Sequence, residues 1–244
     1  MSSRNKISKY ADDTTLLVPQ HTDRCAEDEF RHILDWSNKN KLVINVKKTK
    51  EIIFWRSSQV SKKYTITEIP GVERVSQTKL LGVILTSTLT WSAHIDFILA
   101  TASQRFYLLN QLKKMSLDLT GLGNVFRALI VSRLLYALPA FAGNISQNDI
   151  DRINAMLRKA RRWKISNSDV DFATISTLAD SALLSKIQSP CHCLNQLLPV
   201  IKPNNIYNLR PKSSSQFITP LLKNDKLYNS FIYRCIRLSC VNNY

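Results

Sequence analysis

The chain has 244 residues, of which 34 are lysine or arginine and 18 are aspartate or glutamate, so its formal net charge at pH 7 is +16. An apolar content of 44% suffices for a hydrophobic core and excludes a disordered tail, and the length allows one large domain or two small ones. The charge suits a partner with a phosphate backbone, the alternative being a soluble basic protein without such a partner.

Two short β-like runs, 6–9 and 14–18, flank the tetrapeptide Tyr10–Asp13, which reads Tyr-Ala-Asp-Asp. Adjacent carboxylates at such a chain reversal are able to hold a divalent cation, because Mg²⁺ prefers oxygen ligands. A pair of such cations clamps the attacking and leaving oxygens of a phosphoryl transfer. An Asp-Asp pair is also common in solvated turns, so the surrounding sequence has to decide between the two interpretations.

The next 70 or so residues predict one helix and several strands. Thr22 and Asp23 are suited to start the helix, since a hydroxyl accepts from free N–H groups and an early acid suits the helix dipole. The apolar positions of this helix, expected to pack on a sheet, are Ala26, Phe30, Ile33 and Leu34. Four β-like segments follow it, at 42–46, 51–55, 64–69 and 80–85, with turn signals at Gly71 and near Ser76.

From Ser92 onward the apolar spacing changes from two residues to about 3.6, which predicts helices and places a domain boundary near residue 90. Four helices are expected, over 92–115, over 120–137, from Ser146 onward and over 169–188. Pro139 is expected to end the second helix. Ser146 with Asp149 three residues later imitates a capping box and starts the third. After Pro199 the composition predicts loops.

The third helix carries a run of cations without an acidic residue. Between 152 and 164 these are Arg152, Arg158, Lys159, Arg161, Arg162 and Lys164. Such a face is able to lie against the phosphates of a nucleic-acid duplex. A solvated helix face is the alternative interpretation.

The five cysteines are odd in number and lack paired C-x-x-C spacings, which is typical of reduced thiols in an intracellular protein. The segment Cys191–Cys193 (Cys-His-Cys) contains possible zinc ligands, but adjacent ligands are sterically awkward and no fourth is near, so buried thiols are expected. The N-terminus shows no charged-then-apolar leader. The apolar stretch 128–142 contains Arg133 and Pro139, is too short to span a bilayer and predicts a buried helix. We therefore expect an intracellular protein, nuclear or cytoplasmic, without a membrane partner.

Three motifs, in order, resemble those of the reverse transcriptases of non-LTR (LINE-type, jockey-like) retrotransposons. The string 9–17, Lys-Tyr-Ala-Asp-Asp-Thr-Thr-Leu-Leu, resembles the metal-binding box of the palm. The segment 34–54 is similar to the next motif, in which a helix ending in Trp leads through N-x-L-x-x-N-x-x-K-T into a strand. The segment 79–95, beginning Lys-Leu-Leu-Gly-Val, resembles the hairpin that grips the primer strand and the helix behind it. Three motifs in family order over about 85 residues are specific, although each alone is weak.

The resemblance implies an α+β fold. Residues 1–90 would be the C-terminal part of a palm, a small antiparallel sheet plus a helix. Residues 91–198 would be a mainly helical thumb and connection, and 199–244 a loop-rich C-terminal tail. The parent reaction would be RNA-directed DNA synthesis, a Mg²⁺-dependent nucleotidyl transfer onto a primer 3′-OH, with an RNA template and a DNA primer as partners.

The resemblance also implies roles for single residues. Asp12 and Asp13 would bind Mg²⁺, and Lys48 would neutralise or protonate the departing pyrophosphate. Tyr10 and Ala11 would lie near the terminal nucleotide of the primer. Lys79 and Gly82 would form the primer grip, where glycine permits close backbone approach and lysine meets phosphate. A solvated lysine and a plain β-turn are the structural alternatives for Lys48 and for the grip.

The family takes a third aspartate from an upstream strand, and its template and nucleotide contacts from fingers and early palm segments. Only nine residues precede Tyr10, so we expect an incomplete metal site, a chain that is inactive alone, and the missing N-terminal part of the polymerase as a further partner. Two alternatives stay open. One is a non-catalytic basic module that binds nucleic acid, which leaves the Asp pair unexplained. The other is a translated transposon remnant without function, since a palm lacking its central strands exposes a sheet edge.

Overall fold

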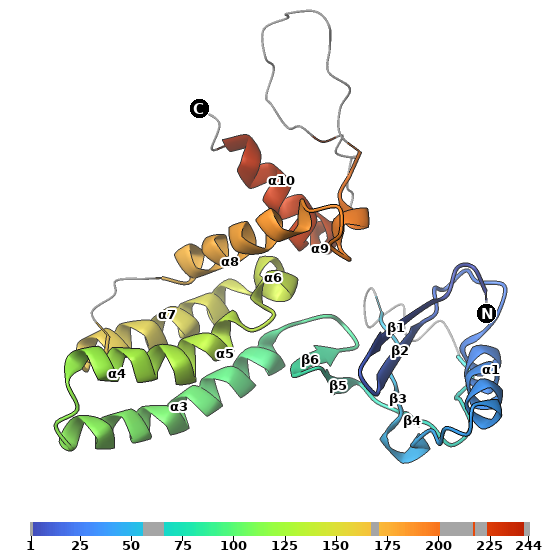
Figure 1. Ribbon diagram of the computed structural model, residues 1–244, viewed down its shortest axis with the longest axis horizontal. Helices are drawn as coiled ribbons and strands as arrows, with labels where there is room; N and C mark the ends of the chain where they lie inside the picture. The colour runs from blue at the N-terminus through green and yellow to red at the C-terminus, as the bar shows by residue number, and fades with distance from the viewer. Residues whose placement is uncertain (1, 56–65, 167–170, 201–216, 218–223, 242–244) are drawn as a thin grey trace, which may run out of the picture. The chain divides into compact units, whose positions relative to one another are not determined.

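The computed structural model describes residues 2–55, 66–166, 171–200, 217 and 224–241. The chain divides into two units (Figure 1): Met1–Leu80 with Leu85–Leu89 form the first, and Leu81–Ile84 with Thr90–Tyr244 form the second, which we call the helical unit. Short strands pair in the first part of the chain and helices dominate the rest, so the α+β class is confirmed.

The predicted hairpin around the Asp pair is present. Strand β1 (Lys6–Tyr10) pairs antiparallel with β2 (Asp13–Leu17), from Lys6 opposite Leu17 to Tyr10 opposite Asp13. A two-residue turn of Ala11 and Asp12 joins the strands, and Ala11 takes a left-handed conformation with φ of 52°. This conformation is unfavourable for alanine, because a left-handed backbone brings Cβ close to the following carbonyl.

Helix α1 (Ala26–Lys39) begins later than predicted. Its N-cap is Cys25, whose Sγ accepts a hydrogen bond from the backbone N–H of Asp28. Thr22 instead donates to Asn5 Oδ1 at 2.9 Å, and Asp23 accepts from the Ser2 hydroxyl. Thr22 and Asp23 therefore bind the segment before β1 and leave the helix start to Cys25.

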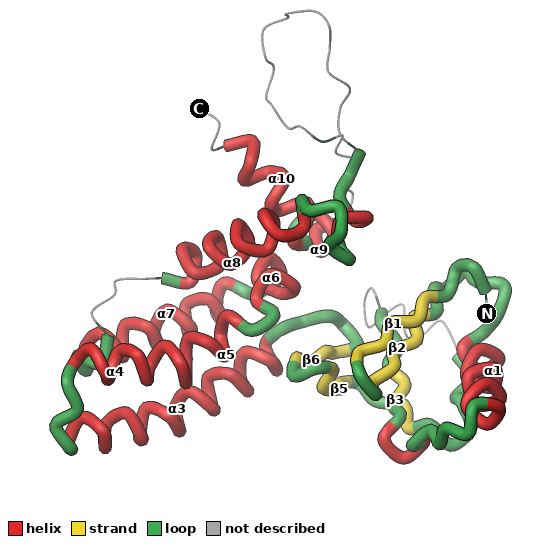
Figure 2. Tube along the Cα trace, in the orientation of Figure 1, coloured by secondary structure: helices red, strands yellow, loops and turns green. Residues whose placement is uncertain are grey.

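The single small sheet predicted for residues 1–90 is wrong for the described part of the chain, which holds three separate two-stranded sheets (Figure 2). Besides β1–β2, strand β3 (Lys50–Glu51) pairs in parallel with β4 (Glu73–Arg74), and β5 (Gln77–Leu80) pairs with β6 (Val83–Thr86). An ion pair of 2.7 Å between Arg74 Nε and Glu51 Oε2 supports the parallel pair.

The expected strand over 42–46 is absent for a local reason. The Asn45 side chain accepts from the backbone N–H of Lys48 at 3.2 Å and starts a 3₁₀-helix, η1 (Val46–Lys48). An asparagine that binds its own backbone in this way competes with strand pairing. The described part of the segment 64–69 is also not a strand, and its residues 64 and 65 lie outside the described residues.

In the helical unit, α3 (Ser92–Lys114) and α7 (Gln147–Arg162) form where the periodicity predicts them. Ser146 caps α7 by accepting from the Asp149 N–H at 3.2 Å, which confirms the predicted helix start. Helix α8 (Phe172–Ile187) is capped by Asp171, and the 3₁₀-helix η4 (Asn195–Leu197) follows it.

The predicted helix 120–137 is instead a series of shorter pieces. It begins with α4 (Leu119–Phe126), continues as a π-helical turn, η2 (Arg127–Val131), and ends with α5 (Ser132–Leu135). Ala137 then takes a left-handed conformation, and α6 (Leu138–Phe141) and η3 (Ala142–Asn144) follow. Pro139 lies in the first turn of α6, where its missing N–H costs nothing, so it helps to begin a helix rather than end one.

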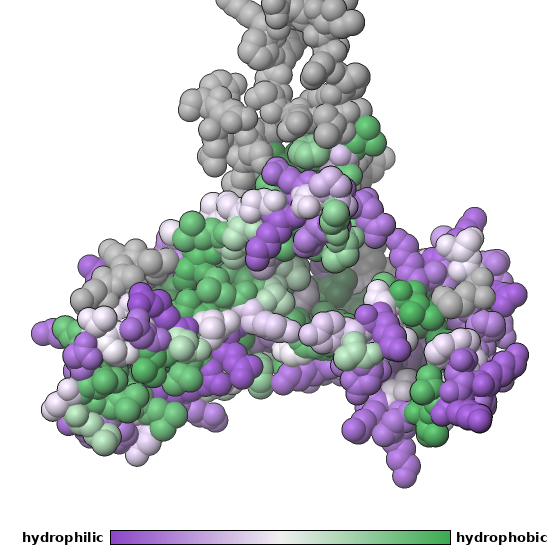
Figure 3. Space-filling model, viewed as in Figure 1, coloured by the Kyte–Doolittle hydropathy of each residue, from purple (hydrophilic) through white to green (hydrophobic). Residues whose placement is uncertain are grey.

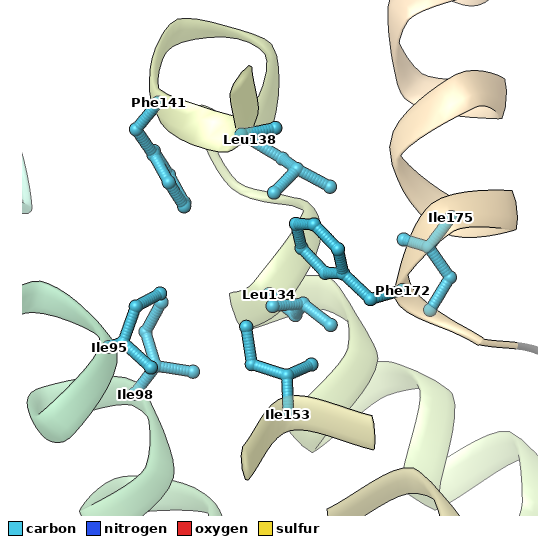
Figure 4. Packing of buried hydrophobic residues seen from close by; sticks show 9 residues of the cluster. Ile95, Ile98, Leu134, Leu138, Phe141, Ile153, Phe172 and Ile175 are labelled. Atoms are coloured by element: carbon cyan, nitrogen blue, oxygen red, sulfur yellow. The ribbon is translucent and has the colours of Figure 1, made fainter. Parts of the chain in front are cut away.

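Apolar side chains of the helical unit form two buried clusters. The first joins Ile95 and Ile98 of α3 to residues of α5, α6, α7 and α8 (Figure 4). The second contains Phe106 and Leu109 of α3 with residues of α4 and α7. The apolar positions of α3, whose spacing of about 3.6 residues predicted the helix, therefore form its buried face. Hydrophilic side chains cover most of the visible face of the first unit, whereas apolar ones gather on the helical unit (Figure 3).

The apolar segment Leu119–Asn144 is long and apolar enough, by length and composition, to cross a membrane. It is longer than the stretch 128–142 that stands out in the sequence. Every third or fourth residue in it is fully buried in the two clusters, including Leu122, Phe126, Ile130 and Leu134. Core packing accounts for much of its apolar character.

The described residues of 199–244 include two helices, where the sequence predicted loops. These are α9 (Asp225–Tyr228) and α10 (Phe231–Val241). Within α10, Cys235 is buried, whereas Cys25, Cys191 and Cys193 are exposed, so the expectation of buried thiols is wrong for the segment Cys191–Cys193.

Candidate nucleic-acid interface

The Asp pair lies at the tip of the β1–β2 hairpin. Asp12 is in the turn and Asp13 opens β2 opposite Tyr10, and all three side chains are exposed. No hydrogen bond or ion pair joins either carboxylate to another described residue. The two carboxylates are therefore available to a ligand from solvent.

Two carboxylates alone do not fit a complete magnesium site. Mg²⁺ demands near-octahedral oxygen coordination, and the described residues contain no group of three or more His, Cys, Asp or Glu side chains that could hold a metal ion. The donors at Asp12 and Asp13 are of the right chemical kind, but their number is too small. Any third carboxylate has to come from outside the part of the chain that the structure describes.

Lys48 is the last residue of η1 and its side chain is exposed. Its backbone N–H is held by Asn45, but its ammonium group makes no ion pair with Asp12 or Asp13. The structure therefore does not join Lys48 to the Asp pair, and its catalytic role stays a prediction.

The second predicted contact point is the β5–β6 hairpin. Lys79 is exposed on β5, and the two turn residues, Leu81 and Gly82, have φ angles of 45° and 86°. The hydroxyl of Tyr136 donates to the Leu81 carbonyl at 2.7 Å. The backbone N–H of Ile84 donates to Nδ1 of His94 at 3.4 Å. Tyr136, 55 positions from Leu81, and His94, 10 positions from Ile84, thus hold the turn in place.

The basic run of α7 divides into two groups. Arg158, Arg161, Arg162 and Lys164 are exposed, as a nucleic-acid contact requires. The other two basic side chains are half-buried and contact neighbouring elements or side chains. Arg152 pairs with Asp96 at 2.5 Å and with Asp149 at 2.9 Å, and Lys159 Nζ lies 4.5 Å from the centre of the Trp163 ring and 5.1 Å from that of Phe106. Arg152 and Lys159 are therefore poor candidates for phosphate contacts.

Two further lysines, which the sequence reasoning missed, extend the exposed group. Lys113 and Lys114 end α3, and Lys113 Nζ donates to the carbonyl of Trp163 at 2.6 Å, joining the C-terminal end of α3 to that of α7. Cations are favourable in the last turn of a helix, where the helix dipole is negative. The place of the two lysines at the end of the predicted helix was therefore the sequence signal that could have identified them. We call the exposed side chains at these two helix ends the basic end. It comprises Lys113, Lys114, Arg158, Arg161, Arg162 and Lys164.

Tyr136 and His94 were also missed as site residues. Tyr136 lies in an apolar run and His94 directly precedes the apolar positions of α3, so the local pattern gave neither residue a role in a site. Their polar atoms become informative only once the turn of the hairpin is placed against them. No protein-family model, characterised protein or solved structure matches this chain.

Proposed function

We propose that this chain is the C-terminal portion of a reverse transcriptase of the non-LTR retrotransposon type, and that it binds a template–primer duplex. The observation that carries the proposal is the exposed Asp12–Asp13 pair at the tip of a two-residue hairpin turn. It is followed, in the order that the resemblance implies, by a second hairpin with an exposed lysine and by a helical unit with a basic end.

Exposed cations supply the chemistry of duplex binding. Lys79 on β5 and the arginines of the basic end are exposed to solvent, and contacts of such cations with phosphate oxygens position a duplex without reading its sequence. Suppose that the four exposed cations of α7 and its C-terminus each neutralise one phosphate. A plot of the logarithm of the binding constant against the logarithm of the salt concentration then has a slope of about −3.6.

The parent reaction would use Mg²⁺ to stabilise charge on the transferred phosphoryl group. Asp12 and Asp13 would supply two of the ligands, and the remaining ones would come from the missing part of the polymerase. Because the described residues do not complete the site, the chain alone is expected to bind nucleic acid without extending a primer.

A non-catalytic nucleic-acid-binding module is the second candidate. The specific observation in its favour is that four arginines and lysines of the basic run are exposed while the described residues lack a three-ligand metal cluster. A functionless remnant is the third. The two buried clusters of the helical unit argue for a folded part that unfolds cooperatively, which a remnant does not require.

The test is primer extension on an RNA template with Mg²⁺, run beside a gel shift of the same duplex over a salt series. Asp12→Ala and Asp13→Ala test the pair, with exposed Asp35→Ala in α1 as control. The combined Arg158→Ala and Arg162→Ala variant tests the basic end. Salt-dependent binding without extension, weakened by the arginine variant, supports the proposal.

Two results would contradict parts of it. Extension that Asp12→Ala abolishes, and Asp35→Ala does not, would show that the chain completes its metal site without a partner. Absence of duplex binding at low salt would reject the nucleic-acid proposal and leave the functionless remnant.

A further inference from the structure

The turn of the β5–β6 hairpin has a backbone that its sequence does not favour. Leu81 and Gly82 both have positive φ angles, 45° and 86°, the combination of a type I′ turn. Glycine adopts such angles freely, but a leucine in the left-handed region brings Cβ too close to the next carbonyl. A leucine is kept in this conformation when the surroundings fix it.

Tyr136 provides one support. Its hydroxyl donates to the Leu81 carbonyl at 2.7 Å, and its ring lies so close to Gly82 that an added Cβ would be 3.2 Å from the ring atom Cε1. The break between α5 and α6 makes this possible. At Tyr136 the backbone leaves the helix with ψ of 120°, and the left-handed Ala137 follows.

His94 provides a second support, on the other side of the turn. Its Nδ1 accepts the backbone N–H of Ile84, the second residue of β6, at 3.4 Å. The imidazole is 3% exposed and packs edge-on against Phe141, with ring centres 4.9 Å apart. The acceptor is thus held by the first buried cluster of the helical unit.

We propose that Tyr136 and His94 are positioning residues, which hold the turn Leu81–Ile84 in the shape that presents the Gly82 backbone, with Lys79 two residues before the turn, to nucleic acid. This inference rests on the proposed function for its ligand, but its geometric part stands on the contacts themselves. In this proposal the helices contribute to nucleic-acid binding in two ways, through their own exposed cations and by fixing the shape of the turn.

The test compares Tyr136→Phe with Tyr107→Phe. Tyr136→Phe removes the hydroxyl and keeps the ring against Gly82, and Tyr107 is an exposed tyrosine of α3 that serves as control. Amide hydrogen exchange of Gly82 and Ile84 reports on the turn, and a gel shift with a primer–template duplex reports on binding. We expect faster exchange at both amides and about two- to tenfold weaker duplex binding in Tyr136→Phe, as the loss of one hydrogen bond gives, and neither change in Tyr107→Phe.

A double-mutant cycle with Lys79→Ala separates positioning from general stability. If Tyr136 acts through the hairpin, Tyr136→Phe weakens duplex binding in the wild-type background and leaves it unchanged in the Lys79→Ala background. Equal effects in both backgrounds, or wild-type exchange rates in Tyr136→Phe, would overturn the inference. A wild-type chain that binds no duplex would reject the proposed function, while faster exchange in Tyr136→Phe would still establish the support of the turn.

Discussion

Asp149 joins the first turns of α3 and α7. It is 1% exposed, and its Oδ2 accepts from the hydroxyls of Ser92 and Ser146, both at 2.7 Å, while Oδ1 accepts from Arg152 at 2.9 Å. Burial alone would raise the pKa of this carboxyl, but these hydrogen bonds and the charge of Arg152 outweigh burial and lower the pKa. The ionised form is therefore the one that stabilises the fold.

This network makes the stability of the helical unit depend on pH. Because the folded pKa lies below the unfolded value of about 3.9, the stabilisation is complete above that value and is lost as the pH falls through the folded pKa. Asp149→Asn is expected to cost about 1–3 kcal/mol at neutral pH and to flatten the acid limb of the stability curve. Urea unfolding at several pH values measures both. The exposed Asp151→Asn is the control, and an acid limb unchanged in Asp149→Asn would contradict the assignment.

At the scale of elements, a partly buried arginine joins α10 to the rest of the helical unit. Arg234 binds Asp180 of α8 through two hydrogen bonds, of 2.7 and 2.8 Å, and also donates to the carbonyls of Asn229 and Pro139. The backbone also packs closely here, since a Cβ at Gly143 would clash with the Asn229 carbonyl oxygen. Removing one partner of a buried pair leaves the other charge uncompensated.

Arg234→Ala is therefore expected to detach α10, at a cost of about 3–5 kcal/mol. Cys235 reports the event, because burial and then the charge of Asp180 raise the pKa of its thiol to about 12 and make it unreactive. In the native chain Cys25, Cys191 and Cys193 should react with a thiol reagent and Cys235 should not. Mass spectrometry of labelled peptides should find Cys235 modified in Arg234→Ala but not in Arg133→Ala, which alters an exposed arginine of α5. Equal protection in both variants would show that α10 docks without the ion pair.

At the scale of the whole helical unit, α3 separates the two contact points proposed for the duplex. His94 near its start holds the β5–β6 turn, and Lys113 at its end joins the basic end. The 19 residue steps from His94 to Lys113 span about 29 Å at 1.5 Å per residue. A B-form duplex rises about 3.4 Å per base pair, so about 8 or 9 base pairs reach from one point to the other.

We therefore expect duplex affinity to rise abruptly once the duplex is long enough to reach both contact points. A duplex of about 12 base pairs should bind at least tenfold more tightly than one of about 6, because only the longer one meets both contact points. Fluorescence anisotropy at fixed salt measures the two affinities. The combined Arg161→Ala and Arg162→Ala variant should reduce this rise in affinity, and a rise of equal size in this variant would exclude the basic end as the second contact point.

The sequence by itself determined the features that depend on neighbouring residues. Apolar periodicity placed α3, the Ser146 cap placed the start of α7, and the β-like runs around Asp12 and Asp13 placed the first hairpin. These predictions held because hydrogen bonds within a helix, a cap or a two-residue turn join residues a few positions apart.

The tertiary structure decided which of those residues are available and what supports them. Asp96, 56 positions from Arg152, binds that arginine, which is therefore a poor candidate for the predicted phosphate contact. Asp180, 54 positions from Arg234, binds the helix α10 in a segment that was predicted to be loop. The short strands pair as three separate sheets, and Tyr136 supports a turn 55 positions away. Contacts of this range depend on how the chain folds back on itself, and local propensity carries no information about the partner.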